Sequence, residues 1–141
     1  MEHRQELSKH RLEEAGRCLR SARLLYEAED YKSAANRSYY CVFNAIRSIF
    51  ALQGRDYKRH SALISAFIKE FIKTQIFDDR MSDILRDLFN IRGKSDYDDF
   101  YVLDKQDISE QIDNAGYFFE QVRMFLKLSD GLGAEAVSGA P

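Results

Sequence analysis

The 141-residue sequence has no tryptophan and only one proline, Pro141, at its very end. Because proline is the strongest interrupter of helices, little prevents long helices from forming before the terminus. The two cysteines, Cys18 and Cys41, are too few for a disulfide framework and lack metal-ligand spacing, so we expect buried, reduced thiols. No apolar run approaches the ~20 residues of a membrane span, and the charged N-terminal segment lacks the apolar stretch of a signal peptide. We therefore expect a cytoplasmic protein.

The chain also has no large excess of charge of one sign. The chain carries 21 basic and 23 acidic residues, a net charge of −2. This balance argues against a surface built as a whole to bind nucleic acid or an anionic membrane, so any such contact requires a local patch. Hydrophobic residues make up 45% of the chain and aromatic residues 13%, which indicates one globular domain with an aromatic-rich core.

What the sequence does contain is helical periodicity. Apolar residues recur every three or four positions in successive segments, and no strand alternation is visible. Asp30 is a suitable N-cap for the second segment and Gly54 a suitable stop. The pattern predicts an all-α protein, an antiparallel up-and-down bundle of four long helices plus one shorter helix. The expected helices cover residues 3–28, 31–53, 61–74, 81–98 and 108–126, with the third one central. We expect a domain of residues 1–128 and a flexible tail of residues 129–141.

The second predicted helix carries an unusual polar stripe. At 100° per residue, the side opposite its apolar face contains Arg37, Tyr40, Asn44 and Arg47, together with Cys41 and Ser48. Lys and Glu, the common residues of a solvated face, are absent. The stripe suits hydrogen-bonded recognition of a carboxylate or phosphate, although an ordinary solvated face remains the alternative.

The stretch "RGKSDYDDF", residues 92–100, follows the apolar pattern of the fourth helix without a break. If the helix persists, Arg92, Ser95, Asp96 and Asp99 continue the stripe that is apolar one turn earlier. Two interpretations are open. The helix either outgrows its packing partners and ends in solvent, or it presents polar groups to a cleft or an interface.

Patterns for catalysis are mostly absent. His3, His10 and His60 lack a metal-ligand spacing, and the aspartates after residue 95 lack the spacing of a calcium-binding loop. There is no phosphate-binding glycine loop and no nucleophile elbow. We therefore expect no metal and no cofactor. The basic loop "GRDYKRH" at residues 54–60 either contacts phosphate or is simply solvated.

Three stretches together resemble the HEPN domain family. They are "RSYYCVFNAIRSIFAL", "RHSALISAFIKEFIKT" and "LFNIRGKSDYDDF", and the likeness covers about residues 7–128. The closest resemblance is to the prokaryotic branch with an Arg-x-x-x-Asp-Tyr motif, matched here by Arg92, Asp96 and Tyr97. The resemblance implies a homodimeric bundle with this motif in a cleft between protomers. It also implies pairing with a minimal nucleotidyltransferase in a toxin–antitoxin-like module.

In the ribonuclease members of the family, a histidine follows the motif arginine by four to six residues. Here no histidine follows Arg92, and metal-free RNA cleavage needs a group that transfers protons near neutral pH. Arg55 and His60 have the ribonuclease spacing, but they lie outside the fourth helix, so we interpret this match as coincidental.

The leading hypothesis is therefore a non-catalytic or atypical binding partner of a nucleotidyltransferase, with a cleft for RNA or a nucleotide. One alternative is a metal-independent endoribonuclease toxin in which Arg92 stabilises charge and Asp96 or Tyr97 handles the proton; another is a structural adaptor. We expect Arg37 or Arg47 to reach Asp96. By family analogy alone, Tyr97 or Tyr101 is a candidate for modification. The candidate cleft residues are Arg37, Tyr40, Asn44, Arg47, Ser95 and Asp99.

Overall fold

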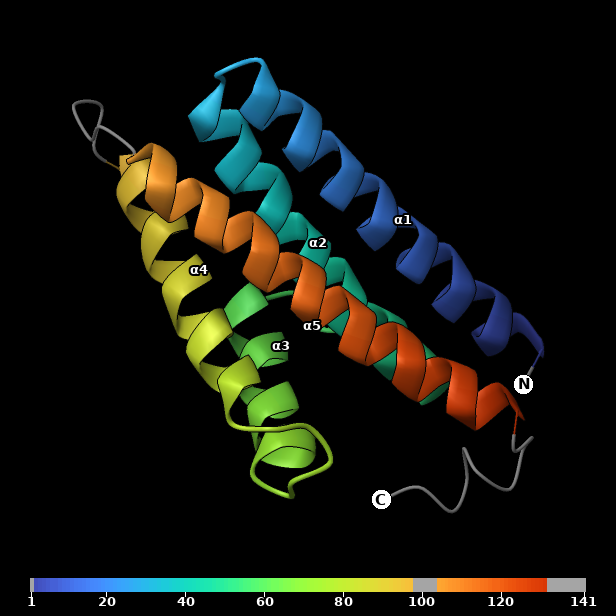
Figure 1. The fold of residues 1–141 in the computed structure, drawn as a ribbon. Helices are drawn as coiled ribbons and strands as arrows, with labels where there is room; N and C mark the ends of the chain where they lie inside the picture. The colour runs from blue at the N-terminus through green and yellow to red at the C-terminus, as the bar shows by residue number, and fades with distance from the viewer. Residues whose placement is uncertain (1, 98–103, 132–141) are drawn as a thin grey trace.

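The computed structural model describes residues 2–97 and 104–131, with side chains for residues 3–90 and 104–128. Within these residues the chain forms helices and no strand (Figure 1), which confirms the all-α prediction. The elements are α1 (Glu2–Glu27), α2 (Tyr31–Leu52), α3 (His60–Phe67), the π-helix η1 (Ile68–Ile72), α4 (Arg80–Tyr97) and α5 (Lys105–Gly131). Most of the predicted tail, residues 129–141, lies outside the described residues. Helix α5 extends to Gly131, so its last three residues belong to the segment predicted as tail.

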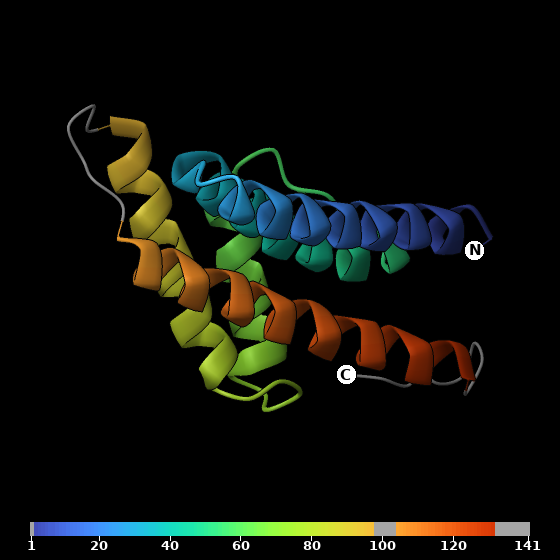
Figure 2. The same ribbon diagram turned by 45° about the horizontal axis from the view of Figure 1, so that its top comes forward.

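The four long helices α1, α2, α4 and α5 alternate in direction as an up-and-down bundle does, whereas the short α3 runs downward as α2 does in Figure 1. Figure 1 shows α1 and α2 as an antiparallel pair, with α5 running beside α2. Figure 2 shows α4 steeply inclined to that pair, so that its C-terminal end projects beyond the bundle. Among the described residues no helix is long and apolar enough to cross a membrane.

Both predicted boundaries of α2 are confirmed. The Asp30 carboxylate accepts a hydrogen bond from the backbone N–H of Ser33 at 3.3 Å, which satisfies one of the free donors of the first turn. Gly54 follows the helix with φ +68°, and its N–H donates to the Ala51 carbonyl at 3.0 Å. A Cβ at Gly54 would also come within 2.6 Å of the Arg4 guanidinium, but that flexible side-chain end can move, so the positive φ is the main reason for glycine here.

The central helix is α2, and the prediction that residues 61–74 form the central helix is wrong. α2 packs against α1, α3, α4 and α5, and thirteen of its residues are buried. The broad apolar arc of residues 61–74 misled because Ile64 and Ile68 are only partly buried at the edge of the core. The small residues Ala34, Cys41 and Ala45 of α2 have no exposed surface, and their size allows neighbouring helices to approach on several sides.

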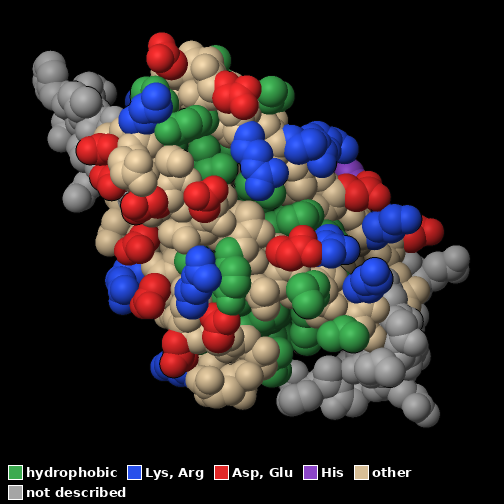
Figure 3. Space-filling model, viewed as in Figure 1, with side chains coloured by type: hydrophobic (Ala, Val, Ile, Leu, Met, Phe, Trp, Pro, Cys, Tyr) green, Lys and Arg blue, Asp and Glu red, His purple; other side chains and the backbone are tan. Residues whose placement is uncertain are grey.

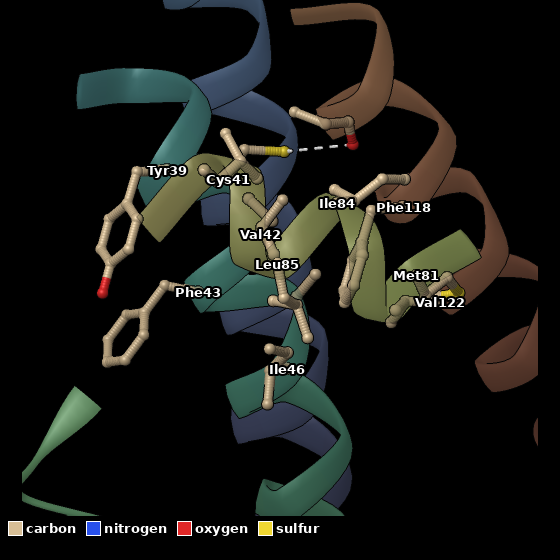
Figure 4. Close-up of a cluster of buried hydrophobic side chains, with 14 of the residues drawn as sticks. Tyr39, Cys41, Val42, Phe43, Ile46, Met81, Ile84, Leu85, Phe118 and Val122 are labelled. Atoms are coloured by element: carbon tan, nitrogen blue, oxygen red, sulfur yellow. Dashed lines mark hydrogen bonds between the residues drawn. The ribbon is translucent and has the colours of Figure 1, made fainter. Parts of the chain in front are cut away.

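The core is built where α2, α4 and α5 converge, and Figure 4 shows Val42, Leu85 and Phe118 among the side chains that meet there. The Cys41 thiol points at the Ala115 carbonyl of α5, with sulfur and oxygen 4.0 Å apart. Burial raises the pKa of this thiol, so Cys41 stays protonated. Both cysteines are buried and free, as expected.

The third predicted helix is not a single α-helix. It is α-helical to Phe67 and then widens into the π-helix η1. Phe67 and Phe71 stack with their ring centroids 5.5 Å apart, and Gln75, at φ 64°, ends the segment. The turn that follows leads directly into α4.

Candidate functional site

An aromatic cluster lies where α2, the start of α3 and α4 meet. His60, the first residue of α3, places its Nδ1 2.8 Å from the hydroxyl oxygen of Tyr39 on α2. The His60 ring also lies against Phe43, with centroids 3.9 Å apart, and meets Tyr40 edge-on at 6.1 Å. Phe89 of α4 reaches the Tyr39 ring at 6.4 Å. We call Tyr39, Tyr40, Phe43 and His60 the His60 cluster.

The hydrogen bond between Tyr39 and His60 has a clear structural reason. The Tyr39 side chain is only 3% exposed, and a buried hydroxyl without a partner is costly. The Tyr39 hydroxyl donates when Nδ1 of His60 is unprotonated and accepts when Nδ1 carries the proton. In both states the bond holds the half-buried imidazole in one orientation against α2.

Two of the predicted cleft arginines flank this cluster. The Arg37 guanidinium lies over the Tyr40 ring at 5.1 Å, and that of Arg47 lies over the Phe43 ring at 5.6 Å. Arg37 donates to its neighbour Asn36 at 2.8 and 3.2 Å. These cation–π contacts hold both guanidinium groups at the edge of the aromatic rings.

Arg47 belongs to a small ion-pair network that ties the loop after α2 to the bundle. It donates to the Asp56 carboxylate at 3.2 Å, and Arg11 of α1 approaches the same carboxylate oxygen at 3.8 Å. Burial opposes the ionisation of Asp56, but hydrogen bonds from Arg47 and the Tyr57 N–H outweigh it and lower the pKa of that carboxyl. The loop that leads to His60 is therefore fixed to α1 and α2.

Arg55 fixes the same loop to the other side. It forms a bidentate pair with Glu70 of η1, at 2.6 and 2.7 Å, and also donates to the Tyr57 hydroxyl. The Glu70 hydrogen bonds raise the pKa of Arg55, and the same bonds lower the pKa of Glu70. Arg55 is thus occupied by a carboxylate of its own chain, which disfavours the interpretation of this loop as an arginine-based phosphate site.

The other polar positions of α2 do not join the His60 cluster. Asn44 donates back to the Tyr40 carbonyl at 3.0 Å, and its amide lies beside the Cys18 thiol of α1. Cys41 and Ser48, which we placed opposite the apolar face, are fully buried, so that part of the prediction is wrong. It failed because a helix that packs against four others has no fully solvated side.

On α4, the backbone is helical through Tyr97, as expected. Arg92 and Asp96 follow Phe89 by three and seven positions, so these positions share one helix face. The motif therefore continues the face from which Phe89 contacts Tyr39. The side chains of residues 91–97, and all of Asp99 and Tyr101, lie outside the described part, so the pairing of Asp96 with Arg37 or Arg47 stays a prediction.

Sequence reasoning missed His60 as a site residue. It was considered only for its spacing from Arg55, whereas its place in the cluster arises because α3 packs against α2, and Tyr39 of α2 also contacts Phe89 of α4. The available signal was Tyr39, a tyrosine in an otherwise apolar stripe, whose buried hydroxyl requires a polar neighbour. Within the described residues, no group of three or more His, Cys, Asp or Glu side chains could hold a metal ion.

The fold and the motif together define a helical domain with a polar and aromatic cluster on α2 and the start of α3, beside the α4 motif, and comparison with known families agrees. The HEPN domain matches residues 8–125, which is most of the chain, and the chain belongs to the HEPN domain family. The resemblance carried by Arg92, Asp96 and Tyr97 is thereby confirmed at the level of the family.

Three curated relatives are similar along much of the chain. The protein named "Putative toxin MJ0142" of Methanocaldococcus jannaschii is 27% identical over 126 residues, covering 89% of this chain and 85% of its own. A "UPF0332 protein" of Thermotoga maritima is 26% identical over 113 residues, covering 80% and 86%. "Putative toxin MJ0605" of M. jannaschii is 27% identical over 79 residues, covering 56% and 59%.

Proposed function

We propose that this chain is the HEPN component of a toxin–antitoxin-like pair, and that it binds RNA or a nucleotide at the His60 cluster and the adjoining residues 92–97 of α4. One observation carries the proposal. His60, held by the buried Tyr39, packs against two rings that each carry an arginine, and Tyr39 also contacts Phe89 on the helix face that bears the Arg92 position. Two curated relatives with toxin in their names support the toxin-like module.

The chemistry of the site suits single-stranded RNA. Such RNA is commonly recognised by stacking of its bases on aromatic rings, with arginines on its phosphates. Phe89 is 44% exposed, so its ring is available for stacking at the rim of the cluster. Arg37 lies at the same rim, donates to the neutral Asn36 amide and can supply charge-assisted hydrogen bonds to phosphate, whereas Arg47 is already paired with Asp56 and adds positive charge at longer range. Because the net charge of the chain is −2, RNA binding requires a local patch of this kind.

The assembly is part of the same proposal. We propose a homodimer whose α4 motifs line a shared cleft, and an adjacent nucleotidyltransferase as the second protein of the pair. We further propose that residues 1–128 act as the domain, that residues 129–141 are a tail, and that the protein acts in the cytoplasm. Tyr97 or Tyr101 is the proposed modification site. These points rest on family membership and not on contacts within the chain.

A second candidate function is a metal-independent endoribonuclease. The position of His60 favours it, because an imidazole can take the proton of the attacking 2′-hydroxyl while Arg92 stabilises the charge on the phosphate. In this version His60, supplied by α3, replaces the histidine that is absent after Arg92. Tyr39 then orients the imidazole and is a positioning residue.

One assay on the purified chain separates these functions. Fluorescence anisotropy with a short single-stranded RNA in EDTA measures binding, and a gel of the same sample measures cleavage. We expect binding that weakens as salt is raised, because released counterions drive it, and intact RNA. Cleavage that is lost in His60→Ala would establish the ribonuclease instead. If the RNA were neither bound nor cleaved, both proposals would be contradicted, and the hypothesis of a structural adaptor would remain.

A further inference from the structure

A second cleft, separate from the His60 cluster, lies between α4 and α5. It is open to solvent, has a volume of ≈ 250 Å³, and is lined by Asp87, Asn90, Asp107, Glu110 and Gln111. Figure 3 shows acidic side chains gathering over α4 and the start of α5, on the side of the molecule where this cleft lies. All five lining residues offer oxygen acceptors, and none of them is cationic.

Gln111 makes this cleft more than an acidic surface. Its side chain is 6% exposed, and its Oε1 accepts no hydrogen bond from any described residue. A buried carbonyl oxygen without a donor is unfavourable, and native proteins rarely leave one so. Gln111 lines the cleft, so a rotation of its side chain toward the cleft would let a ligand N–H satisfy this buried oxygen.

The carboxylates of the cleft also lack cationic partners among the described residues. Among the described residues, neither Asp87 nor Asp107 forms an ion pair, and Glu110 accepts only a long hydrogen bond of 3.4 Å from the Gln106 amide. Neighbouring acids on the same helices are paired, Asp83 with Arg86 and Glu120 with Arg123. Asp107 lies in the first turn of α5, where the helix dipole stabilises it. The dipole does not account for Asp87, which lies within α4, or for the unpaired Gln111 oxygen.

The arrangement of the acceptor groups indicates which kind of cation fits the cleft. Within the described residues no group of three or more His, Cys, Asp or Glu side chains could hold a metal ion. A guanidinium group carries five N–H donors in a planar fork and can reach several separated acceptors at once. We propose that this cleft binds a guanidinium group, from a free small molecule or from an arginine of a partner protein. This proposal is independent of the RNA-binding proposal, because the negative charge of the cleft would repel the phosphates of RNA.

Agmatine, a small guanidinium compound, tests the site directly. In ¹⁵N-labelled wild-type protein at constant ionic strength, titration with agmatine is expected to shift the Gln111 side-chain amide saturably, at concentrations on the order of 1 mM. The variant Asp87→Asn/Glu110→Gln removes two exposed carboxylates and should bind at least about tenfold more weakly. The control Glu13→Gln/Glu27→Gln removes two exposed carboxylates of α1 and should change affinity less than about twofold.

The source of the guanidinium is identified in the same experiment. A capped tripeptide with a central arginine that binds more tightly than agmatine assigns the site to a partner protein, and the reverse order assigns it to a small molecule. Binding of the matching lysine tripeptide as strong as that of the arginine peptide would overturn the guanidinium assignment. Absence of a saturable Gln111 shift, or equal binding by both double variants, would overturn the site itself. RNA binding measured in parallel is expected to be unchanged in Asp87→Asn/Glu110→Gln, so failure here is distinct from failure of the proposed function.

Discussion

Replacing Phe118 with alanine is expected to lower the free energy of unfolding by about 3–5 kcal/mol. Phe118 has no exposed surface, and its ring lies 5.5 Å from that of Phe67, so it joins α5 to α3. Removal of the ring leaves a cavity that the rigid helices around it cannot close. Domains of this size are stable by only about 5–15 kcal/mol, so the loss is a large share of the total.

Urea denaturation followed by far-ultraviolet circular dichroism measures this loss. The matched control is Leu24→Ala on α1, since Leu24 is an apolar side chain that is 67% exposed. We expect the control to change the free energy of unfolding by less than about 0.5 kcal/mol. If Phe118→Ala cost no more than Leu24→Ala, the core where α2, α3 and α5 meet would be incorrectly described.

Substituting Arg92 with alanine is expected to weaken RNA binding about 10- to 100-fold, the range of one charge-assisted hydrogen bond to phosphate. His60→Ala is expected to weaken binding by a similar factor, because His60 is bonded to Tyr39, which contacts Phe89 on the face of α4 that bears the Arg92 position. If both residues contact one ligand, the double variant should lose less than the sum of the two single effects. Anisotropy with the same single-stranded RNA measures all three.

The control for these variants is Arg86→Ala. Arg86 lies on the same helix, six positions before Arg92, and pairs with Asp83 at 3.0 Å on the exposed surface. It should change RNA affinity by less than about threefold, through the loss of general charge alone. An equal loss in Arg86→Ala and Arg92→Ala would mean that RNA binding follows overall charge and has no defined site on α4.

Much of the fold could be predicted because local chemistry determines it. The Asp30 cap and the Gly54 stop bound α2 as expected, and periodic apolar residues located the long helices. The burial of α2 on several sides could not be predicted. Cys41 and Ser48 are polar enough to suggest a solvated face, yet both are small enough to fit between packed helices. Residue size, and not polarity, decided their environment.

The candidate site was predictable only in part. Tyr40, Arg37 and Arg47 could be selected from the composition of one helix face, and the structure places all three at or beside the His60 cluster. His60 could not be selected, because it is 21 residues from Tyr39 and their hydrogen bond exists only after α3 packs against α2. Long-range contacts of this kind leave no periodic trace in the sequence.

The most direct test of RNA recognition at the His60 cluster is to map the contact by nuclear magnetic resonance. A short single-stranded RNA is added to labelled wild-type protein, and the His60 ring signals and the backbone amides of residues 92–97 are followed. We expect saturable shifts at both, with the Gln111 side-chain amide unaffected. Saturable binding that shifts signals elsewhere while those of His60 and residues 92–97 stay in place would contradict the account.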